Sequence, residues 1–411
     1  MLSPMSNPRT DSQDAPALVG GQPVRDKFLI FGSPAIEEPE IQEVLDTLRS
    51  GWLGTGPKVK RFEADFNRYV GSRNALALNS ATAGLHLALD VLGVGPGDEV
   101  ITTPMTFTAT ANVVVHLGAR PVFVDIERDT MNIDPARIEA AITPRTKVIM
   151  PVHMAGRPCE IDAINEIAKR RGLHVIEDAA HAIETVYRGK KVGSISDISV
   201  FSFYVTKNLC TGEGGMVTTD NDAWAEELRM KSLHGINNDA WKRYSAAGFR
   251  PYETFYPGYK YNMMDIQASL GIHQLERIEK NLTLRERYWA MYDEAFADLP
   301  ELITPSPDLP PDSRHARHLY SLLVDLDRLK VDRNQFIQAL QKENIGVGVH
   351  FTALHLHKYY RETYGYTPGS YPNTEWVGER TISLPLSARL TDEDVASVIH
   401  AVRRIARYYR R

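Results

Sequence analysis

The sequence is poor in cysteine and has no excess of positive charge. Only Cys159 and Cys210 occur among its 411 residues. Two cysteines cannot form a disulfide framework in a chain of this length, and they do not make the CxxC pair typical of zinc sites. Acidic residues outnumber Lys and Arg by 52 to 47, so the chain lacks the broad positive field that holds nucleic acid or an acidic membrane surface. These absences argue against a nucleic-acid partner and favour the reducing cytoplasm.

Long apolar runs are absent as well. None approaches the roughly 18 residues needed to span a bilayer, and the first residues lack the basic and apolar regions of a signal peptide. Apolar residues make up 43% of the chain and charged residues 24%, close to ordinary globular usage. We therefore expect a globular, cytoplasmic protein of enzyme size with no membrane association.

The pattern of the chain predicts three regions. Residues 1–26 are rich in Ser, Pro, Asp and Gly with few apolar anchors, which predicts a loose tail. Within residues 27–265, β-type and helical runs alternate, which is typical of a large α/β domain with a mainly parallel sheet and helices on both faces. A long helical stretch, 266–299, then opens the last region, 266–411, where we expect a linking helix and a small α+β domain.

Individual elements follow from the periodicity of apolar residues. We expect strands at 100–103, 122–125, 148–152 and 175–178, a helix at 161–171, and an amphipathic helix through Ile41, Val44, Leu45 and Leu48 that ends at Gly51. In open α/β sheets, ligands gather beyond the carboxyl ends of the strands. Polar residues at those ends are therefore the first candidates for a functional site.

Several chemical groups follow the expected strands. The strand at 175–178 ends in the Asp178 carboxylate, and a later strand leads to Lys207 and then to a glycine cluster at 212–215. Small hydroxyl residues at 79–84 open a helix, where free N–H groups make a phosphate site. With Phe107 as an aromatic that can stack on a ring, these features supply what pyridoxal 5'-phosphate (PLP) requires.

Each requirement has a chemical reason. A carboxylate beside the ring nitrogen keeps it protonated, which makes the ring an electron sink. The lysine holds the cofactor as an imine and, once displaced by substrate, moves a proton between the substrate carbon and the cofactor.

Taken singly, these residues have plainer interpretations. Lys207 alone would be a solvated lysine, Asp178 and Asn262 alone would be helix N-caps, and Phe107 alone would be core. Only the ordered set at one sheet edge favours a cofactor site.

Two further classes of function stay open at this point. The group of His350, His355 and His357 leaves a metal site conceivable, although no nearby Cys or spaced carboxylate pair completes one. A non-enzymatic regulator or binding module would not need a lysine, a carboxylate and a phosphate cup together.

From Phe28 to the C-terminus, the sequence resembles the DegT/DnrJ/EryC1/StrS sugar aminotransferases, a branch of the fold type I PLP enzymes. The resemblance implies an α/β fold type I enzyme with PLP as cofactor. The motifs that carry it are Gly51-Trp52-Leu53-Gly54-Thr55-Gly56, Ser80-Ala81-Thr82, Glu177-Asp178-Ala179-Ala180-His181, Phe201-Ser202-Phe203, Thr206-Lys207-Asn208, Gly212-Glu213-Gly214-Gly215, Pro257-Gly258-Tyr259-Lys260-Tyr261-Asn262, His350-Phe351 with His355, and Ser383-Leu384-Pro385-Leu386.

The resemblance also implies a role for each site residue. Family members that act as sugar dehydratases carry His at the lysine position, so Lys207 favours amino transfer. A homodimer with shared active sites is implied, because an Asn of the neighbouring subunit reaches the phosphate in this family. The implied set has Lys207 as Schiff-base lysine, Asp178 at the ring nitrogen, His181 near the cofactor, Ala81, Thr82 and Ser202 at the phosphate, Phe107 stacked on the ring, Asn262 as the Asn of the neighbouring subunit, and Thr55, Tyr204 and His350 at the substrate.

The substrates implied are L-glutamate as amino donor and a keto sugar carried by a nucleoside diphosphate. The subgroup that forms UDP-4-amino-4-deoxy-L-arabinose from a UDP-4-keto-pentose, for lipopolysaccharide, is the most similar by His234-Gly235, Asp239-Ala240, Tyr359-Tyr360-Arg361-Glu362 and Pro372-Asn373-Thr374-Glu375-Trp376. A 4-keto-6-deoxyhexose is the alternative, since one methyl group in an apolar pocket changes binding by only ~1–3 kcal/mol.

Some positions depart from the family pattern or have two readings. Tyr204 stands where many relatives carry His, Glu184 stands where small residues are common, and Phe107 replaces the Trp of some members. Lys242, Arg243 and Arg250 either meet a nucleotide diphosphate or belong to a solvated loop.

Overall fold

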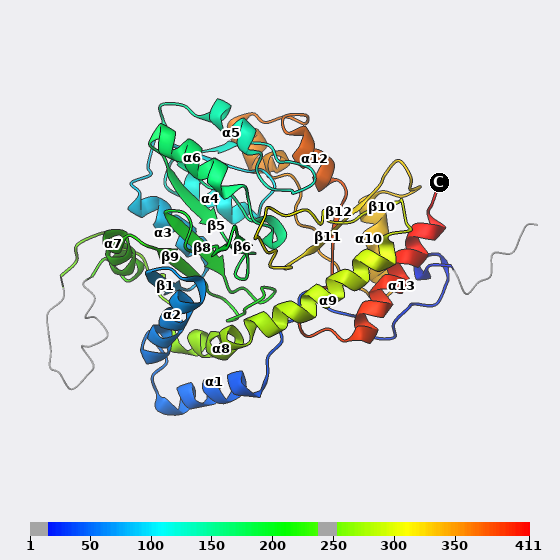
Figure 1. Ribbon diagram of the computed structural model, residues 1–411, viewed down its shortest axis with the longest axis horizontal. Helices are drawn as coiled ribbons and strands as arrows, with labels where there is room; N and C mark the ends of the chain where they lie inside the picture. Colours follow the sequence, from blue (N-terminus) through cyan, green and yellow to red (C-terminus); the bar gives the residue numbers. More distant parts are fainter. Residues whose placement is uncertain (1–14, 237–252) are drawn as a thin grey trace, which may run out of the picture.

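The computed structural model describes residues 15–236 and 253–411. A large part surrounds a seven-stranded sheet, and a small part surrounds a three-stranded sheet. Figure 1 shows the large part on the left, the small part on the right, and helix α9 running from one to the other.

The large sheet has the strand order β1-β9-β8-β5-β4-β2-β3. β9 pairs antiparallel with both of its neighbours, and all the other pairs are parallel. The predicted α/β class with a mainly parallel sheet is therefore confirmed. The strands are β1 (Asn74–Leu78), β2 (Glu99–Thr102), β3 (Arg120–Phe123), β4 (Thr146–Ile149), β5 (His174–Asp178), β8 (Ile198–Ser202) and β9 (Gly215–Thr219), with a separate hairpin of β6 (Val186–Tyr187) and β7 (Lys190–Lys191).

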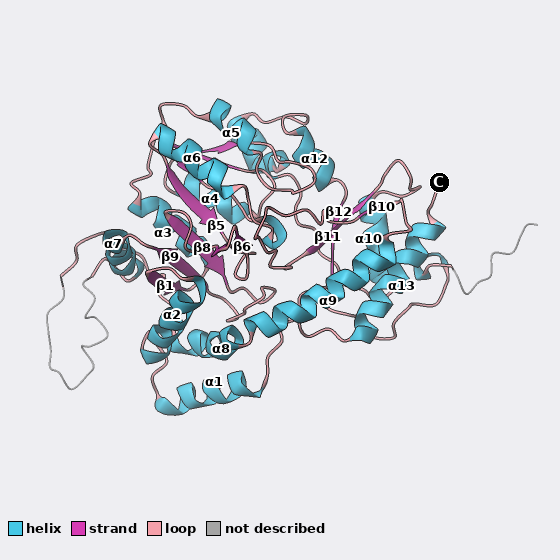
Figure 2. Ribbon diagram, viewed as in Figure 1, coloured by secondary structure: helices cyan, strands magenta, loops and turns pink. Residues whose placement is uncertain are grey.

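Helices cover both faces of this sheet, as Figure 2 shows. α2 and α8 pack on one face through Phe62, Phe66 and Ile272, whereas α3, α4 and α7 pack on the other through Leu85, Val114 and Leu228. Buried aliphatic and aromatic side chains on both sides of the strands hold these layers together. The helices are α1 (Glu38–Ser50), α2 (Pro57–Val70), α3 (Ala81–Val91), α4 (Thr108–His116), α5 (Pro135–Ala141), α6 (Ile161–Arg171), α7 (Asp222–Ser232), α8 (Asp265–Glu276) and α9 (Ile278–Phe296).

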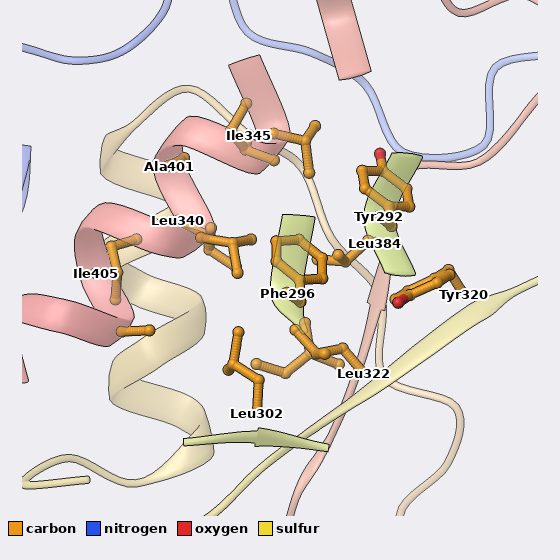
Figure 3. Close-up of a cluster of buried hydrophobic side chains, with 14 of the residues drawn as sticks. Tyr292, Phe296, Leu302, Tyr320, Leu322, Leu340, Ile345, Leu384, Ala401 and Ile405 are labelled. Carbon is orange, nitrogen blue, oxygen red and sulfur yellow. The ribbon is translucent and has the colours of Figure 1, made fainter. Parts of the chain in front are cut away.

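The small part has its own core. Tyr292 and Phe296 of α9 meet Tyr320 of the small sheet, and Leu340 and Ile405 close the cluster (Figure 3). The antiparallel sheet β10-β11-β12 carries this core together with α10 and α13. The elements are β10 (Leu302–Ile303), β11 (Tyr320–Val324), β12 (Thr381–Leu384), α10 (Arg333–Lys342), α11 (Lys358–Tyr364), α12 (Pro372–Gly378) and α13 (Asp392–Tyr408). The predicted domain boundary at 265/266 stays a prediction.

The long helix predicted over 266–299 is interrupted. α8 ends and α9 begins around Arg277, whose backbone (φ −107°, ψ 11°) leaves the helical region. Its guanidinium donates to the buried Glu40 of α1 at 2.7 Å and to the Ala35 carbonyl at 2.8 Å. Contacts with α1 thus accompany a break that the apolar periodicity does not reveal.

The tail predicted over residues 1–26 is too long. The N–H groups of Ala17 and Val24 each donate to the buried Glu343 carboxylate at 2.9 Å, and Arg404 also pairs with Glu343. The segment from Ala15 onward is therefore fixed to the small part by polar contacts that its composition does not show.

Helix α1 is confirmed, and it ends at Gly51 in the left-handed conformation, as predicted. Two of its four apolar residues, however, face outward: Ile41 is 45% exposed and Leu48 is 50% exposed, whereas Val44 and Leu45 are half-buried and Glu40 and Thr47 are buried. An amphipathic helix with apolar residues in solvent marks a surface that another molecule can cover.

Among the helices of the described ranges, none combines the length and the apolar composition needed to cross a membrane.

Candidate active site

A cavity of about 550 Å³ lies beyond the carboxyl ends of β5 and β8, and the small part closes one side of it. Nine of the residues expected at the cofactor or substrate line it together: Ala81, Thr82, Phe107, Asp178, His181, Ser202, Tyr204, Lys207 and His350. Residues as far apart along the chain as Ala81 and His350 thus share one site.

The start of α3 forms one wall of this cavity. The Ser80 hydroxyl caps the helix by accepting from the Ala83 N–H at 3.1 Å. Ala81 and Thr82 follow at the end of the helix where backbone N–H groups have no partner in the helix. Gly215 of β9 lies close by, since a Cβ there would be 2.6 Å from the Ala81 nitrogen. The wall is suited to an anion such as phosphate.

Asp178 ends β5 and points into the cavity as a buried carboxylate. The Thr110 hydroxyl donates to its Oδ2 at 2.8 Å, and the Ala180 N–H donates to its Oδ1 at 3.1 Å. Burial raises the pKa of Asp178, against these two hydrogen bonds and the positive charge of Lys207. A cation placed beside Asp178 would favour its ionised form.

Lys207 lies in the same cavity, in the loop that follows β8. Burial lowers its pKa to about 8, although the negative charge of Asp178 opposes this shift. A lysine in such surroundings can supply a neutral amine near physiological pH, which is the form that attacks a carbonyl group.

Two histidines complete the polar lining. Burial and then the charge of Lys207 hold the pKa of His181 well below its usual value. The same causes, in the same order, lower the pKa of His350 to about 4. Since both rings are neutral at neutral pH, Lys207 is the one cation among the residues that line this cavity within the described part of the chain.

Aromatic rings stand on another side of the cavity. Phe107 and Phe351 have ring centroids 6.2 Å apart, and Tyr204 lies in the lining with them. Phe107 is 60% exposed, so its face is available to a flat ligand.

Two expected site residues are not in this cavity. Thr55 and Asn262 line a separate hollow of about 650 Å³ together with Trp52, Leu53 and Met264. There the Asn262 amide donates to the Thr55 hydroxyl at 2.7 Å. Within one chain, therefore, Asn262 does not share the Lys207 cavity.

The sequence did not single out Thr110, which holds Asp178. Thr110 lies three residues after Phe107 on α4, and its hydroxyl is 2.7 Å from that of Thr106. The run of threonines in this segment was visible, but nothing in it indicated a carboxylate from a strand far along the chain.

The histidines that left a metal site open are separated by their contacts. His350 bonds to Ser383 at 2.8 Å, whereas His355 bonds to Glu375 at 2.9 Å. Among the described residues, no group of three or more His, Cys, Asp or Glu side chains is arranged to hold a metal ion. Lys242, Arg243 and Arg250, considered for the diphosphate, and the Asp239-Ala240 motif lie outside the described residues.

Comparison with known proteins gives concordant matches. The model of the DegT/DnrJ/EryC1/StrS aminotransferase family matches residues 34–403. The spore coat polysaccharide biosynthesis protein SpsC of Bacillus subtilis is 51% identical over 384 residues, which are 93% of this chain and 98% of SpsC.

Solved structures match over a similar length. The putative sugar aminotransferase Spr1654 of Streptococcus pneumoniae in its PLP form has a TM-score of 0.85 and 38% identity, over 93% of this chain and 99% of that one. DesI, solved in the presence of its TDP-sugar product, has a TM-score of 0.84 and 32% identity, over 95% of this chain and 96% of that one.

Proposed function

We propose, from the premise that the chain belongs to the DegT/DnrJ/EryC1/StrS aminotransferase family, that it transfers the amino group of L-glutamate to a 4-keto sugar carried by a nucleoside diphosphate. The chain is a PLP-dependent enzyme and a sugar aminotransferase, as its family and its solved relatives show. The proposals below concern the roles of its site residues, the arrangement of its subunits and the identity of its sugar substrate.

The observation that carries the site assignment is the meeting of three groups in one cavity. The Lys207 amine, the buried Asp178 carboxylate and the start of α3 all line it. They fit PLP, because the cofactor needs an amine for its aldehyde, a carboxylate for its ring nitrogen and N–H groups for its phosphate. The close approach of Gly215 to Ala81 keeps the phosphate wall compact.

When bound, PLP supplies an electron sink for the carbon from which a proton is removed. Lys207 would hold the cofactor through its Nζ and, when released as a neutral amine, move a proton at that carbon. Thr110 and Ala180 hold the Asp178 carboxylate in place in the cavity, where it would meet the ring nitrogen of the cofactor. Ala81, Thr82 and Ser202 would bind the phosphate, Phe107 would stack on the ring, and His181 would lie beside it.

We infer that the enzyme is a homodimer whose subunits share active sites. Asn262 and Thr55 lie in the separate hollow, next to Leu53 and Met264, which are 42% and 44% exposed. α1, which leads directly into Gly51 and Trp52 of the hollow lining, carries two more exposed apolar residues, Ile41 and Leu48. A second subunit covering the hollow and α1 would bury these apolar residues and bring Asn262 to the partner's phosphate wall.

We propose a UDP-4-keto-pentose as the acceptor sugar, with a product that is used for lipopolysaccharide. A 4-keto-6-deoxyhexose is the alternative acceptor. Tyr204 and His350 lie in the cavity wall near Phe351, where an acceptor sugar would meet them. DesI, a structural relative, was solved with a TDP-sugar product, which supports a nucleotide sugar as the class.

The test is a panel of UDP- and dTDP-linked 4-keto sugars, pentose and 6-deoxyhexose, each with L-glutamate. Amination of the UDP-pentose with the highest kcat/KM supports the first choice, and a higher value for a hexose supports the alternative. If none of these sugars accepts an amino group while 2-oxoglutarate still forms from glutamate, the 4-keto nucleotide-sugar assignment is wrong.

A further inference from the structure

A series of hydrogen-bonded polar groups, buried except for the half-buried Asn208, runs from α9 to the edge of the cavity. It starts at Glu184, the residue whose size departs from the family pattern, and Glu184 is fully buried. Arg285 of α9, also buried, donates to Glu184 Oε1 at 2.5 Å. Asn208 donates from Nδ2 to Glu184 Oε2 at 2.8 Å. Both carboxylate oxygens thus have partners, and one of these partners directly follows Lys207.

These contacts fix the direction of the Asn208 amide. Nδ2 lies 2.8 Å from Glu184 Oε2 and 3.2 Å from the Ala316 carbonyl, and neither oxygen can donate. The NH₂ group must therefore face them, which leaves Oδ1 as an acceptor on the other side. His318 Nδ1 lies 3.0 Å from this Oδ1. Since Oδ1 can only accept, the hydrogen of this bond belongs to His318 Nδ1.

His181, the neighbour of His318, has the opposite tautomer. The Ala155 N–H donates to His181 Nδ1 at 3.2 Å, so a neutral His181 carries its hydrogen on Nε2. The two ring centroids are 4.6 Å apart. Burial, and then the charge of Lys207, hold the pKa of both rings well below the usual value. Beside the lysine there are thus two neutral imidazoles in opposite tautomers.

We propose that Glu184 is a positioning residue for amino transfer, which through Asn208 fixes the chain directly after Lys207 and holds His318 in the Nδ1–H tautomer beside His181. This inference rests on the proposed function, because it gives the series of polar groups a role at the proposed cofactor lysine. Without the Glu184 carboxylate, the Asn208 amide keeps only the longer bond to the Ala316 carbonyl, at 3.2 Å. The amide is then held less firmly and can turn, which lets His318 move its hydrogen to Nε2. Two adjacent rings would then both offer Nε2–H, and the loop that carries Lys207 would lose an anchor.

A simpler interpretation is that the Glu184–Arg285 ion pair only joins α9 to the large part. The two interpretations differ in the tautomer of His318, which a purely structural ion pair would not control. Glu343 offers a matched control, because it is also fully buried, pairs with Arg404 and accepts N–H groups, but lies in the small part.

The experiment is nitrogen NMR of protein labelled with ¹⁵N-histidine, since the ring-nitrogen shifts separate the two neutral tautomers and the cation. Spectra are recorded with and without PLP for the unchanged protein, Glu184→Gln, Asn208→Ala and Glu343→Gln, and His318→Gln assigns the signal. We expect Nδ1–H for His318 in the unchanged protein and in Glu343→Gln, and a shift toward Nε2–H in Glu184→Gln and Asn208→Ala. In those two variants kcat should fall roughly tenfold, as for a small misplacement of a reacting group, with a smaller change in the KM for glutamate.

An Nε2–H or cationic His318 in the unchanged protein overturns the proposal. So does an unchanged tautomer in the variants, or an equal change in Glu343→Gln, since any lost ion pair would then suffice. If Glu184→Gln does not fold, Asn208→Ala decides alone, because it keeps the ion pair. The tautomer is read without turnover, so a failed search for the sugar and a failed tautomer prediction are separate results.

Discussion

The cavity around Lys207 and the hollow around Asn262 differ in what covers them. The cavity is walled by the large sheet edge, by α3 and by the small part of the same chain. The hollow is lined by Leu53 and Met264, both exposed, and by Gly51 and Trp52, which directly follow α1. The cavity draws its lysine, its carboxylate and its helix start from a single chain, whereas the hollow has polar groups flanked by exposed apolar side chains.

From this difference we infer which groups each subunit contributes to an active site. Lys207, which would bond to the cofactor, and Asp178, which would keep the ring nitrogen protonated, need a defined low-dielectric setting, and one chain provides it. A group that only contacts the phosphate can come from a second chain, because it has to bind and not to react. The following predictions change each region in turn, beginning with the largest expected effect.

Loss of the Lys207 amine should abolish amino transfer. We expect Lys207→Ala to lower kcat by at least about 10⁴-fold, the scale found when a covalent nucleophile is lost. The mutant should also lose the visible absorbance of the attached cofactor, which spectroscopy of the purified protein measures. Lys191→Ala, at a lysine paired with Glu279 outside the cavity, is the control. Turnover at the original rate in Lys207→Ala would overturn the site assignment.

The carboxylate should matter through its charge. Asp178→Asn keeps the shape and removes the charge that would hold the ring nitrogen protonated, so kcat should fall by at least about 10²-fold. The control is Asp125→Asn, at another buried carboxylate, which accepts from Thr374 at 2.7 Å outside the cavity lining. Equal losses in both variants, measured by steady-state kinetics, would mean that Asp178 is only structural.

The pH at which the cofactor attaches should report the surroundings of Lys207. Its pKa is lowered to about 8, and the neutral amine, present above that pKa, is the nucleophile. The rate at which cofactor-free protein captures PLP should therefore rise roughly tenfold per pH unit below about 8 and level off above it. Stopped-flow absorbance measures this rate. A rate that still climbs steeply at pH 9.5 would show an ordinary exposed lysine.

The smallest expected effect concerns the hollow around Asn262 and tests whether Asn262 serves the active site of the partner subunit. Lys207→Ala and Asn262→Ala proteins, each poorly active, are unfolded together and refolded as mixed dimers. If Asn262 serves the partner's site, a mixed dimer has one site with both lesions and one intact site, and activity should return toward about a quarter of the original for random pairing. No recovery, with mixed dimers verified by mass, would place Asn262 in cis or outside the site and leave the amino transfer untouched.

Apolar periodicity and chain order predicted the strands and the edge where the site lies, because both depend on local pattern and on the geometry of parallel sheets. β2 and β5 lie within one residue of the expected ranges, whereas β3 and β4 begin two residues earlier than expected and end two and three residues earlier. The residues that a helix or strand contacts in the folded protein could not be predicted in this way. The outward face of α1, the break at Arg277 and the link from Glu184 to Asn208 each depend on partners far along the chain. No local pattern encodes them.

The attachment of the N-terminal segment to Glu343 bears on how this protein should be handled. A truncation to Phe28, which the polar composition invites, would strip two amide donors from a fully buried carboxylate. Glu343 Oε2 keeps its contact with Arg404, but Oε1 loses the N–H donor that it has from Ala17. A buried acceptor left bare costs about 1–3 kcal/mol, so the shortened protein should be less stable, although every cavity residue is still present. Trimming for crystallisation should end before Ala15, and an affinity tag belongs ahead of that point.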